Sequence, residues 1–229
     1  FDAPTLAGGA FTIRVTAADI PSDALPNVGD DTDQDFALVC INCTARPDYT
    51  LTIPEPQQSL CTTQTTSAQF GVAVGSVLGY ASPVSLTLDG VPAGATGAVS
   101  PAQTTPPGDV TVALGQLGAV PPGTYTLPLR AASASATREW PLTLTLANAL
   151  PAAPALAAPA NDADDVDFMP TFTWSASAQA ADYLLEVAKD PAFANIVLTR
   201  SGRNIDATPA NALDSRTRYW WRVRAANVC

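Results

Sequence analysis

The sequence of 229 residues contains no histidine and a single lysine, Lys189. Without histidine there can be no His-based catalytic triad, no His metal ligand and no imidazole base at neutral pH. A single lysine argues against Schiff-base and phosphate-loop chemistry. The longest weakly polar stretch, residues 149–160, is interrupted by prolines, and no run reaches the 18 apolar residues of a membrane helix. No membrane span is therefore predicted.

Basic residues are few, 11 against 21 acidic ones, and the net charge is −10. Because an acidic chain repels phosphate backbones, we expect no nucleic-acid partner. Glutamate is nearly as scarce as lysine, so two strong helix formers are almost missing. The 21 prolines and 14 glycines, with short alternating runs of Thr and Val, indicate an all-β chain with frequent turns.

The pattern divides the chain into three parts. Residues 1–47 hold two strand-like runs, 10–17 and 35–41, which form at most a hairpin that needs something else to pack on. Residues 48–147 have the length and turn spacing of a β-sandwich, and residues 148–229 hold a proline-rich linker and a second set of strands. Strands are expected near 48–54, 68–75, 83–89, 95–99, 109–115, 123–131 and 137–147. The last part has a lead-in strand from the linker and then strands near 170–175, 181–188, 195–200, 204–208 and 217–226.

The last part carries Thr171-Phe172-Thr173-Trp174, a strand over 182–188, and Leu213 and Tyr219 at a characteristic spacing. This pattern resembles a fibronectin type III module. The resemblance implies that Trp174 is the core tryptophan, and that Tyr219 buries its ring while its hydroxyl bonds to nearby backbone. The sequence departs from the family in reaching Cys229 just after the sixth strand, so the seventh strand is expected to be absent.

Two further resemblances concern the other parts of the chain. Residues 83–88, 91–95 and 124–127 resemble bacterial Ig-like modules, which are strung along secreted proteins and lack catalytic residues. Residues 7–15 and 33–39 resemble the final hairpin of the jelly-roll domain that follows the catalytic domain in secreted bacterial peptidases of the subtilisin-like and related classes. These likenesses imply tandem Ig-like and fibronectin type III β-sandwiches preceded by a β-hairpin, from the tail of a secreted protein.

The four cysteines, Cys40, Cys43, Cys61 and Cys229, suit disulfides in an oxidising, extracellular setting. A Cys40–Cys43 bond requires a turn at Ile41-Asn42, because residues three apart in a straight strand are too far apart to bridge. We expect Cys61 and Cys229 to pair, since the poles of the two sandwiches that carry them face each other across the linker. The alternative is a Cys43–Cys61 bond. The all-β setting and the missing ligands argue against redox catalysis and zinc.

Asp31, Asp33 and Asp35 form a cluster of carboxylates that calcium favours. The EF-hand pattern fails, because Phe36 and Asn42 stand where it needs glycine and glutamate. A simpler calcium site competes with a solvated acidic turn, which we favour. The same choice holds for a second group in the lead-in to the fibronectin-like part, Asp162, Asp164, Asp165 and Asp167. Calcium is the only cofactor suggested.

Trp220 and Trp221 are adjacent, so in a strand they point to opposite faces and one of them is expected outside. An exposed indole there would bind sugars or would stack with arginine in an outer ladder, and we favour the ladder. That ladder comprises Arg218, Trp220, Arg222 and Arg224. The three glutamates form no catalytic constellation; Glu139 and Glu186 are expected to be ordinary surface residues in strands.

The sequence therefore predicts a non-catalytic set of extracellular spacer, adhesion or binding modules appended to a secreted bacterial protein, with a peptidase as the parent. Its expected partners are other domains or copies of the same protein, a cell surface or a polymeric substrate. One alternative is a subunit of an extracellular filament, assembled when residues 10–17 of one copy complete the open sheet edge of another. The other is a carbohydrate-binding module.

Overall fold

The computed structural model describes residues 46–229. Several predictions lie outside the described residues: those for Asp31, Asp33 and Asp35 and those for Cys40 and Cys43. The predicted hairpin in residues 1–47 also lies outside them, except for its last two residues. The described part consists of β-strands with one short 3-10 turn, η1 (Leu117–Ala119), and the all-β prediction is confirmed. None of its helical segments is long and apolar enough to cross a bilayer.

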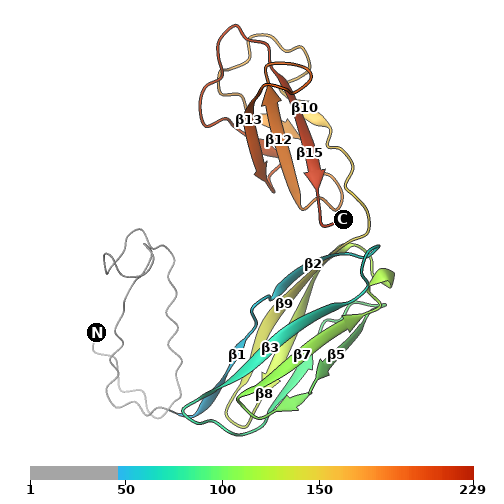
Figure 1. Ribbon diagram of the computed structural model, residues 1–229, viewed down its shortest axis with the longest axis vertical. Helices are drawn as coiled ribbons and strands as arrows, with labels where there is room; N and C mark the ends of the chain where they lie inside the picture. Colours follow the sequence, from blue (N-terminus) through green and yellow to red (C-terminus); the bar gives the residue numbers. More distant parts are fainter. Residues whose placement is uncertain (1–45) are drawn as a thin grey trace, which may run out of the picture. The chain divides into compact units, whose positions relative to one another are not determined.

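Nine strands form a first β-sandwich of two sheets (Figure 1). One sheet has the order β1-β3-β7-β5 and the other the order β2-β9-β8-β4-β6. All neighbours are antiparallel except β2 and β9, which are parallel. This is the arrangement of an Ig-like sandwich. The strands are β1 (Asp48–Thr52), β2 (Gln57–Cys61), β3 (Ala68–Val77), β4 (Val84–Leu88), β5 (Thr96–Ser100), β6 (Gln103–Thr104), β7 (Gly108–Gly115), β8 (Gly123–Ala132) and β9 (Thr137–Ala147).

The first stretch of this sandwich is divided between the two sheets. β1 pairs with β3 in one sheet, and β2 pairs with β9 in the other. Pro54 and Pro56 lie between them. Because proline has no N–H to give to a strand ladder, the chain leaves the first sheet there and enters the second. β2 and β6 were not predicted from the sequence. Cys61 is the last residue of β2.

The core of the first sandwich comes from strands that alternate buried and exposed residues. β3 buries every second residue from Ala68 to Val74; β7 does so beside it in the same sheet, and β8 and β9 do so in the facing sheet. Tyr49 on β1 is 1% exposed, and its hydroxyl donates to the carbonyl of Ala131 at 2.8 Å, with the carbonyl of Ala136 at 3.2 Å. This buried hydroxyl ties the first strand to the β8–β9 hairpin.

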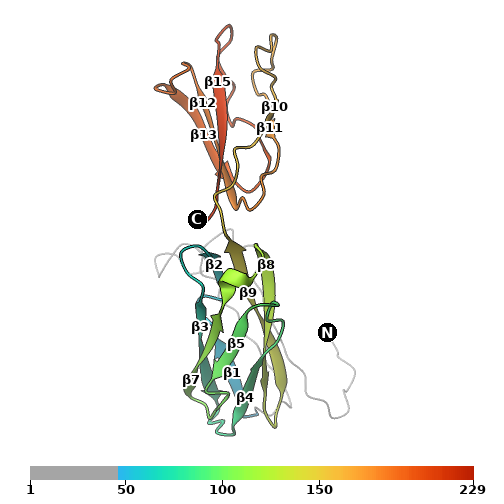
Figure 2. The same ribbon diagram turned by 90° about the vertical axis from the view of Figure 1, so that its right-hand side faces the viewer.

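Six strands form a second sandwich with its own core (Figure 2). Its sheets have the orders β10-β11-β14 and β13-β12-β15, with antiparallel neighbours throughout. Within the described residues β15 pairs only with β12, so one edge of its sheet has no neighbour there. The strands are β10 (Leu156–Ala158), β11 (Phe172–Trp174), β12 (Asp182–Ala188), β13 (Ile196–Gly202), β14 (Asp206–Ala207) and β15 (Trp220–Ala226).

We expect Tyr49→Phe to lower the free energy of unfolding of the first sandwich by about 1 kcal/mol, because a buried hydroxyl loses its hydrogen bond. Tyr125→Phe is the matched control, since its hydroxyl bonds to the carbonyl of Pro121 at 2.7 Å in an exposed position. Urea unfolding of the variants measures both effects. Equal losses of unfolding free energy in the two variants would show that the buried hydrogen bond of Tyr49 stabilises the fold no more than the exposed one of Tyr125.

Candidate functional site: the junction of the two sandwiches and the outer face of β12 and β15

Cys61 and Cys229 form a disulfide bond, with Cα atoms 4.9 Å apart. The predicted pairing is confirmed, and the alternative Cys43–Cys61 pairing is wrong because Cys61 is already bonded. Cys61 is the last residue of β2 and is only 3% exposed. Cys229 follows β15, the last strand of the second sandwich. The bond therefore joins the second strand of one sandwich to the segment that follows the last strand of the other.

The backbone around Cys61 holds its side chain in place. The N–H groups of Gln64 and Thr65 both donate to the carbonyl of Cys61, at 2.9 and 3.0 Å, which closes a tight turn after β2. The N–H of Thr62 donates to the carbonyl of Ala147 at the end of β9, at 2.8 Å. One half of the disulfide is thus fixed by hydrogen bonds within the first sandwich.

Side-chain amides make a second tie at the start of the linker. Gln179 accepts a hydrogen bond from the N–H of Asn148 at 2.8 Å and donates one to the side-chain oxygen of Asn148 at 2.9 Å. Asn227 donates to the carbonyl of Ala149 at 2.8 Å and to that of Gln179 at 3.1 Å. The linker thereby begins attached to the β11–β12 turn and to the segment after β15. The sequence analysis missed these three amides, since isolated Asn and Gln residues form no pattern.

The outer face of the second sandwich carries a buried carboxylate. Glu186 on β12 is 7% exposed, although the sequence analysis expected a surface residue. Arg222 Nε donates to its Oε2 at 2.7 Å, and Arg224 Nη2 donates to the same oxygen at 3.1 Å. Burial by itself would raise the pKa of Glu186, but the hydrogen bond from Arg222 outweighs it and lowers the pKa below 4.5. The two arginines of β15 thus cover and neutralise one glutamate of β12.

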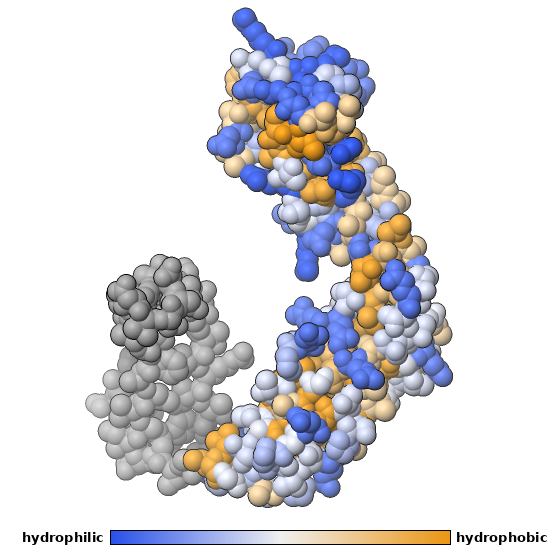
Figure 3. All heavy atoms as spheres, in the orientation of Figure 1, coloured by the Kyte–Doolittle hydropathy of each residue, from blue (hydrophilic) through white to orange (hydrophobic). Residues whose placement is uncertain are grey.

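The turn between β12 and β13 places an aromatic ring on this cluster. The carboxylate of Asp190 accepts hydrogen bonds from the N–H groups of Ala192, Ala194 and Asn195 at 3.0, 3.1 and 2.6 Å, and these bonds lower its pKa. In the bent turn Phe193 adopts a positive φ of 57°. Its ring centroid lies 4.1 Å from the guanidinium carbon of Arg222. Figure 3 shows hydrophilic and hydrophobic residues side by side over the second sandwich.

The two adjacent tryptophans have different surroundings, as predicted. Trp221 meets Phe172 edge to face, with ring centroids 5.2 Å apart, and packs against the core. Trp220 alternates with it along β15 and lies on the face of Arg222 and Arg224. Arg222 of the predicted ladder lies over the ring of Phe193. The sugar-binding hypothesis therefore applies to Trp220 and not to Trp221.

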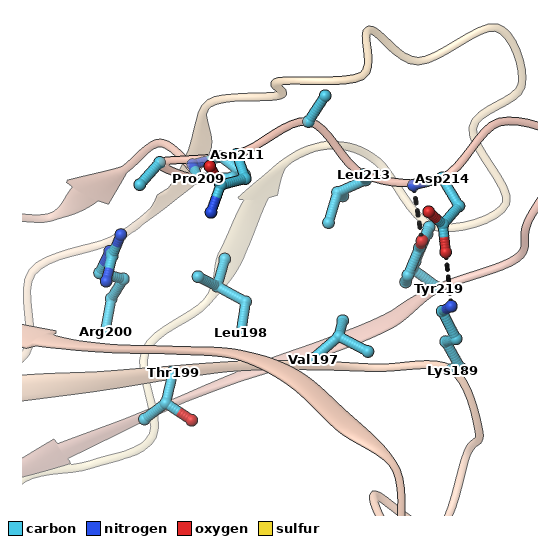
Figure 4. A pocket seen from close by; sticks show the side chains of 12 residues that line it. Lys189, Val197, Leu198, Thr199, Arg200, Pro209, Asn211, Leu213, Asp214 and Tyr219 are labelled. Carbon is cyan, nitrogen blue, oxygen red and sulfur yellow. Dashed lines mark hydrogen bonds and ion pairs between the residues drawn. The ribbon is translucent and has the colours of Figure 1, made fainter.

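The residues assigned structural roles lie in or beside the second core. Trp174 is 5% exposed, and Leu213 and Tyr219 pack against the same cluster. The Tyr219 hydroxyl accepts a hydrogen bond from the backbone N–H of Asp214 at 2.9 Å, as the fibronectin resemblance implies. Figure 4 shows this bond beside the ion pair of Asp214 with Lys189, which is 2.5 Å long. These contacts form one end of a shallow hollow of about 380 Å³ between β13 and residues 209–214.

The acidic residues between β10 and β11 form no group that could hold a metal ion in the described part of the chain. Among residues 46–229, no three side chains of the types Cys, Asp and Glu lie close enough to hold an ion. Asp162, the first of this group, lies 3.5 Å from Arg218 in an exposed ion pair. The calcium prediction for Asp31, Asp33 and Asp35 falls on residues outside the described part and stays a prediction.

Comparisons with known proteins give distant structural likenesses only. No family model matches the chain, and no curated protein matches it. Domains 4 and 5 of the S-layer protein SbsC align with 45% of this chain at 21% identity and a TM-score of 0.33. Titin domains A168–A170 align with 80% of it at 14% identity and a TM-score of 0.35. The chain covers 54% and 61% of those two structures, less than two thirds of either.

We expect Glu186→Gln to change how stability depends on acid. The pKa of Glu186 is lowered in the folded state, so its contribution is full above about pH 4.5 and is lost as the pH falls through the lower folded value. The difference in Tm between wild type and variant should therefore be largest above pH 4.5 and should shrink below it. Glu139→Gln, at an exposed position of β9, is the control. Parallel Tm profiles for wild type and Glu186→Gln would contradict this account.

Proposed function

We propose that residues 46–229 are a non-catalytic two-module spacer of a secreted bacterial protein. The observation that carries this proposal is the Cys61–Cys229 bond, which joins the two sandwiches covalently at a point far from the linker in sequence. The amide contacts of Gln179 and Asn227 with the linker support it. Together these ties restrict bending at the junction, and a spacer with restricted bending holds its neighbours at a set separation.

The secreted setting is supported by the disulfide itself, because such bonds persist in oxidising compartments. A peptidase parent is supported only by the likeness of residues 7–15 and 33–39 to the end of a peptidase-associated jelly roll. In that arrangement the two sandwiches would hold the catalytic domain away from a surface or against a polymeric substrate.

The titratable groups with displaced pKa values support a role without catalysis. Ion pairing with Arg138 lowers the pKa of Asp48, and Lys189 does the same for the pKa of Asp214. Turn hydrogen bonds lower the pKa of Asp190. Each carboxylate is held by a structural contact, whereas a catalytic acid or base needs a pKa matched to proton transfer near the working pH.

Two other functions have an observation each in their favour. The edge of β15 that has no neighbour in the described residues favours strand addition, which would produce assemblies visible by sedimentation and abolished by deletion of residues 1–20. The position of Trp220 beside an arginine pair favours sugar binding, which would quench tryptophan fluorescence on addition of polysaccharide and would be lost in Trp220→Ala.

The spacer proposal is tested by the distance distribution between the two sandwiches. Spin labels attached through non-cysteine chemistry at the exposed residues Thr111 and Ser201 report that distance in the full chain. We expect one narrow distribution for the oxidised protein, and a broader one for the double variant Cys61→Ser, Cys229→Ser. The matched control is Cys40→Ser, Cys43→Ser, which should remain narrow.

A broad distribution in the oxidised wild-type protein would overturn the spacer proposal, since the junction would then be flexible despite its ties. Equal widths for the wild type and the Cys61→Ser, Cys229→Ser variant would show that the disulfide does not set the separation.

A further inference from the structure

The disulfide divides the described chain unequally. Cys61 and Cys229 are 168 positions apart, so nearly all of both sandwiches lies inside the loop that the bond closes. Outside the loop, on its N-terminal side, the described residues are 46–60, which form β1 and most of β2. The shortest covalent path from residue 46 to Cys229 therefore runs along β1 and β2 and crosses the disulfide. It bypasses every strand from β3 to β15.

We propose that the Cys61–Cys229 bond takes the second sandwich, and strands β3 to β9 of the first, out of the covalent path of mechanical tension. When the chain is pulled on the N-terminal side of Cys61 and at Cys229, the load passes through residues 46–61 and the two sulfur atoms. The looped backbone carries no covalent tension, because a closed loop attached at a single bridge is not stretched by a pull across that bridge. Looped residues resist the pull only through the pairing of β1 with β3 and of β2 with β9, until those strands separate. This inference rests on the proposed spacer role and specifies which residues bear the load.

The segment that carries the load, residues 46–61, can lengthen only slightly under tension. A β-strand already rises about 3.3 Å per residue, and a fully extended chain reaches about 3.3–3.6 Å per residue. Ten of the sixteen residues from 46 to 61 are in β1 and β2. Even if both strands peeled away from β3 and β9, the chain would lengthen by only about 10 Å. The oxidised spacer is therefore nearly inextensible without any need for mechanically strong sheets.

Because of this load path, tension along the chain does not reach the outer face of the second sandwich. The cluster of Glu186, Arg222 and Phe193 lies on β12, β15 and the turn after β12, all within the closed loop. Its geometry depends on the register of β12 with β15, which a pull through the chain would otherwise disrupt. With the bond closed, a binding face in this position keeps its shape while the chain is under tension.

Single-molecule stretching of the full chain, held through peptide tags at both ends, tests the proposal. In the oxidised protein only residues 1–61 can extend, which limits the extension to roughly 200–220 Å. In a dithiol reductant, the reductant is oxidised to its cyclic disulfide and both cysteines become thiols, so all 229 residues can extend to roughly 750–820 Å. We expect a three- to fourfold change in maximum extension.

Two double variants identify the bond responsible. Cys61→Ser, Cys229→Ser should reach the long extension without reductant, and Cys40→Ser, Cys43→Ser should keep the short one. An extension beyond about 220 Å in oxidised wild-type protein would overturn the proposal, as would a short extension in the Cys61→Ser, Cys229→Ser variant. A broad distribution of the spin-label distance would contradict the rigid spacer but would not contradict this proposal. The load path through the disulfide remains even if the junction is flexible.

Discussion

The bond between Cys61 and Cys229 is the constraint on which the arrangement of residues 46–229 depends. In the chain-entropy model, closing a loop of 168 positions restricts the unfolded chain enough to contribute about 5 kcal/mol to stability. That contribution is shared between two sandwiches with separate cores. The same bond places the end of the second sandwich at the edge strand β2 of the first. A local cross-link within one module would achieve neither effect.

The position of Cys61 is itself a consequence of two prolines. Pro54 and Pro56 cannot donate to a strand ladder, so the chain leaves β3 and crosses to the opposite sheet, where β2 runs parallel to β9. β9 leads directly into the linker, and the carbonyl of Ala147 at its end accepts a hydrogen bond from the N–H of Thr62. Cys61 therefore lies beside the point where the first sandwich ends, within reach of the segment that follows β15.

Alternation and turn residues are local signals, and they were enough to predict the fold class. The pairing of Cys61 with Cys229 was expected from the resemblance of the two parts to known modules, with Cys43–Cys61 left open, and the structure decides between them. β2 was missed since Gln57-Gln58-Ser59-Leu60-Cys61 does not alternate, and its pairing with β9 joins residues more than 80 positions apart. Glu186 was misjudged for a related reason. Its burial depends on the register of β12 with β15, which places Arg222 directly opposite it. Local sequence patterns predict neither the register between strands nor the hydrogen bonds of side-chain amides.

The spacer and its load path both require that Cys61 be bonded to Cys229. Proteolysis of the full chain under non-reducing conditions, followed by mass spectrometry of the cross-linked peptides, detects this bond. We expect one peptide pair that contains Cys61 and Cys229 and that separates on reduction. A peptide pair joining Cys61 to Cys43 or Cys40 would contradict this expectation, and the spacer and its load path would both have to be abandoned.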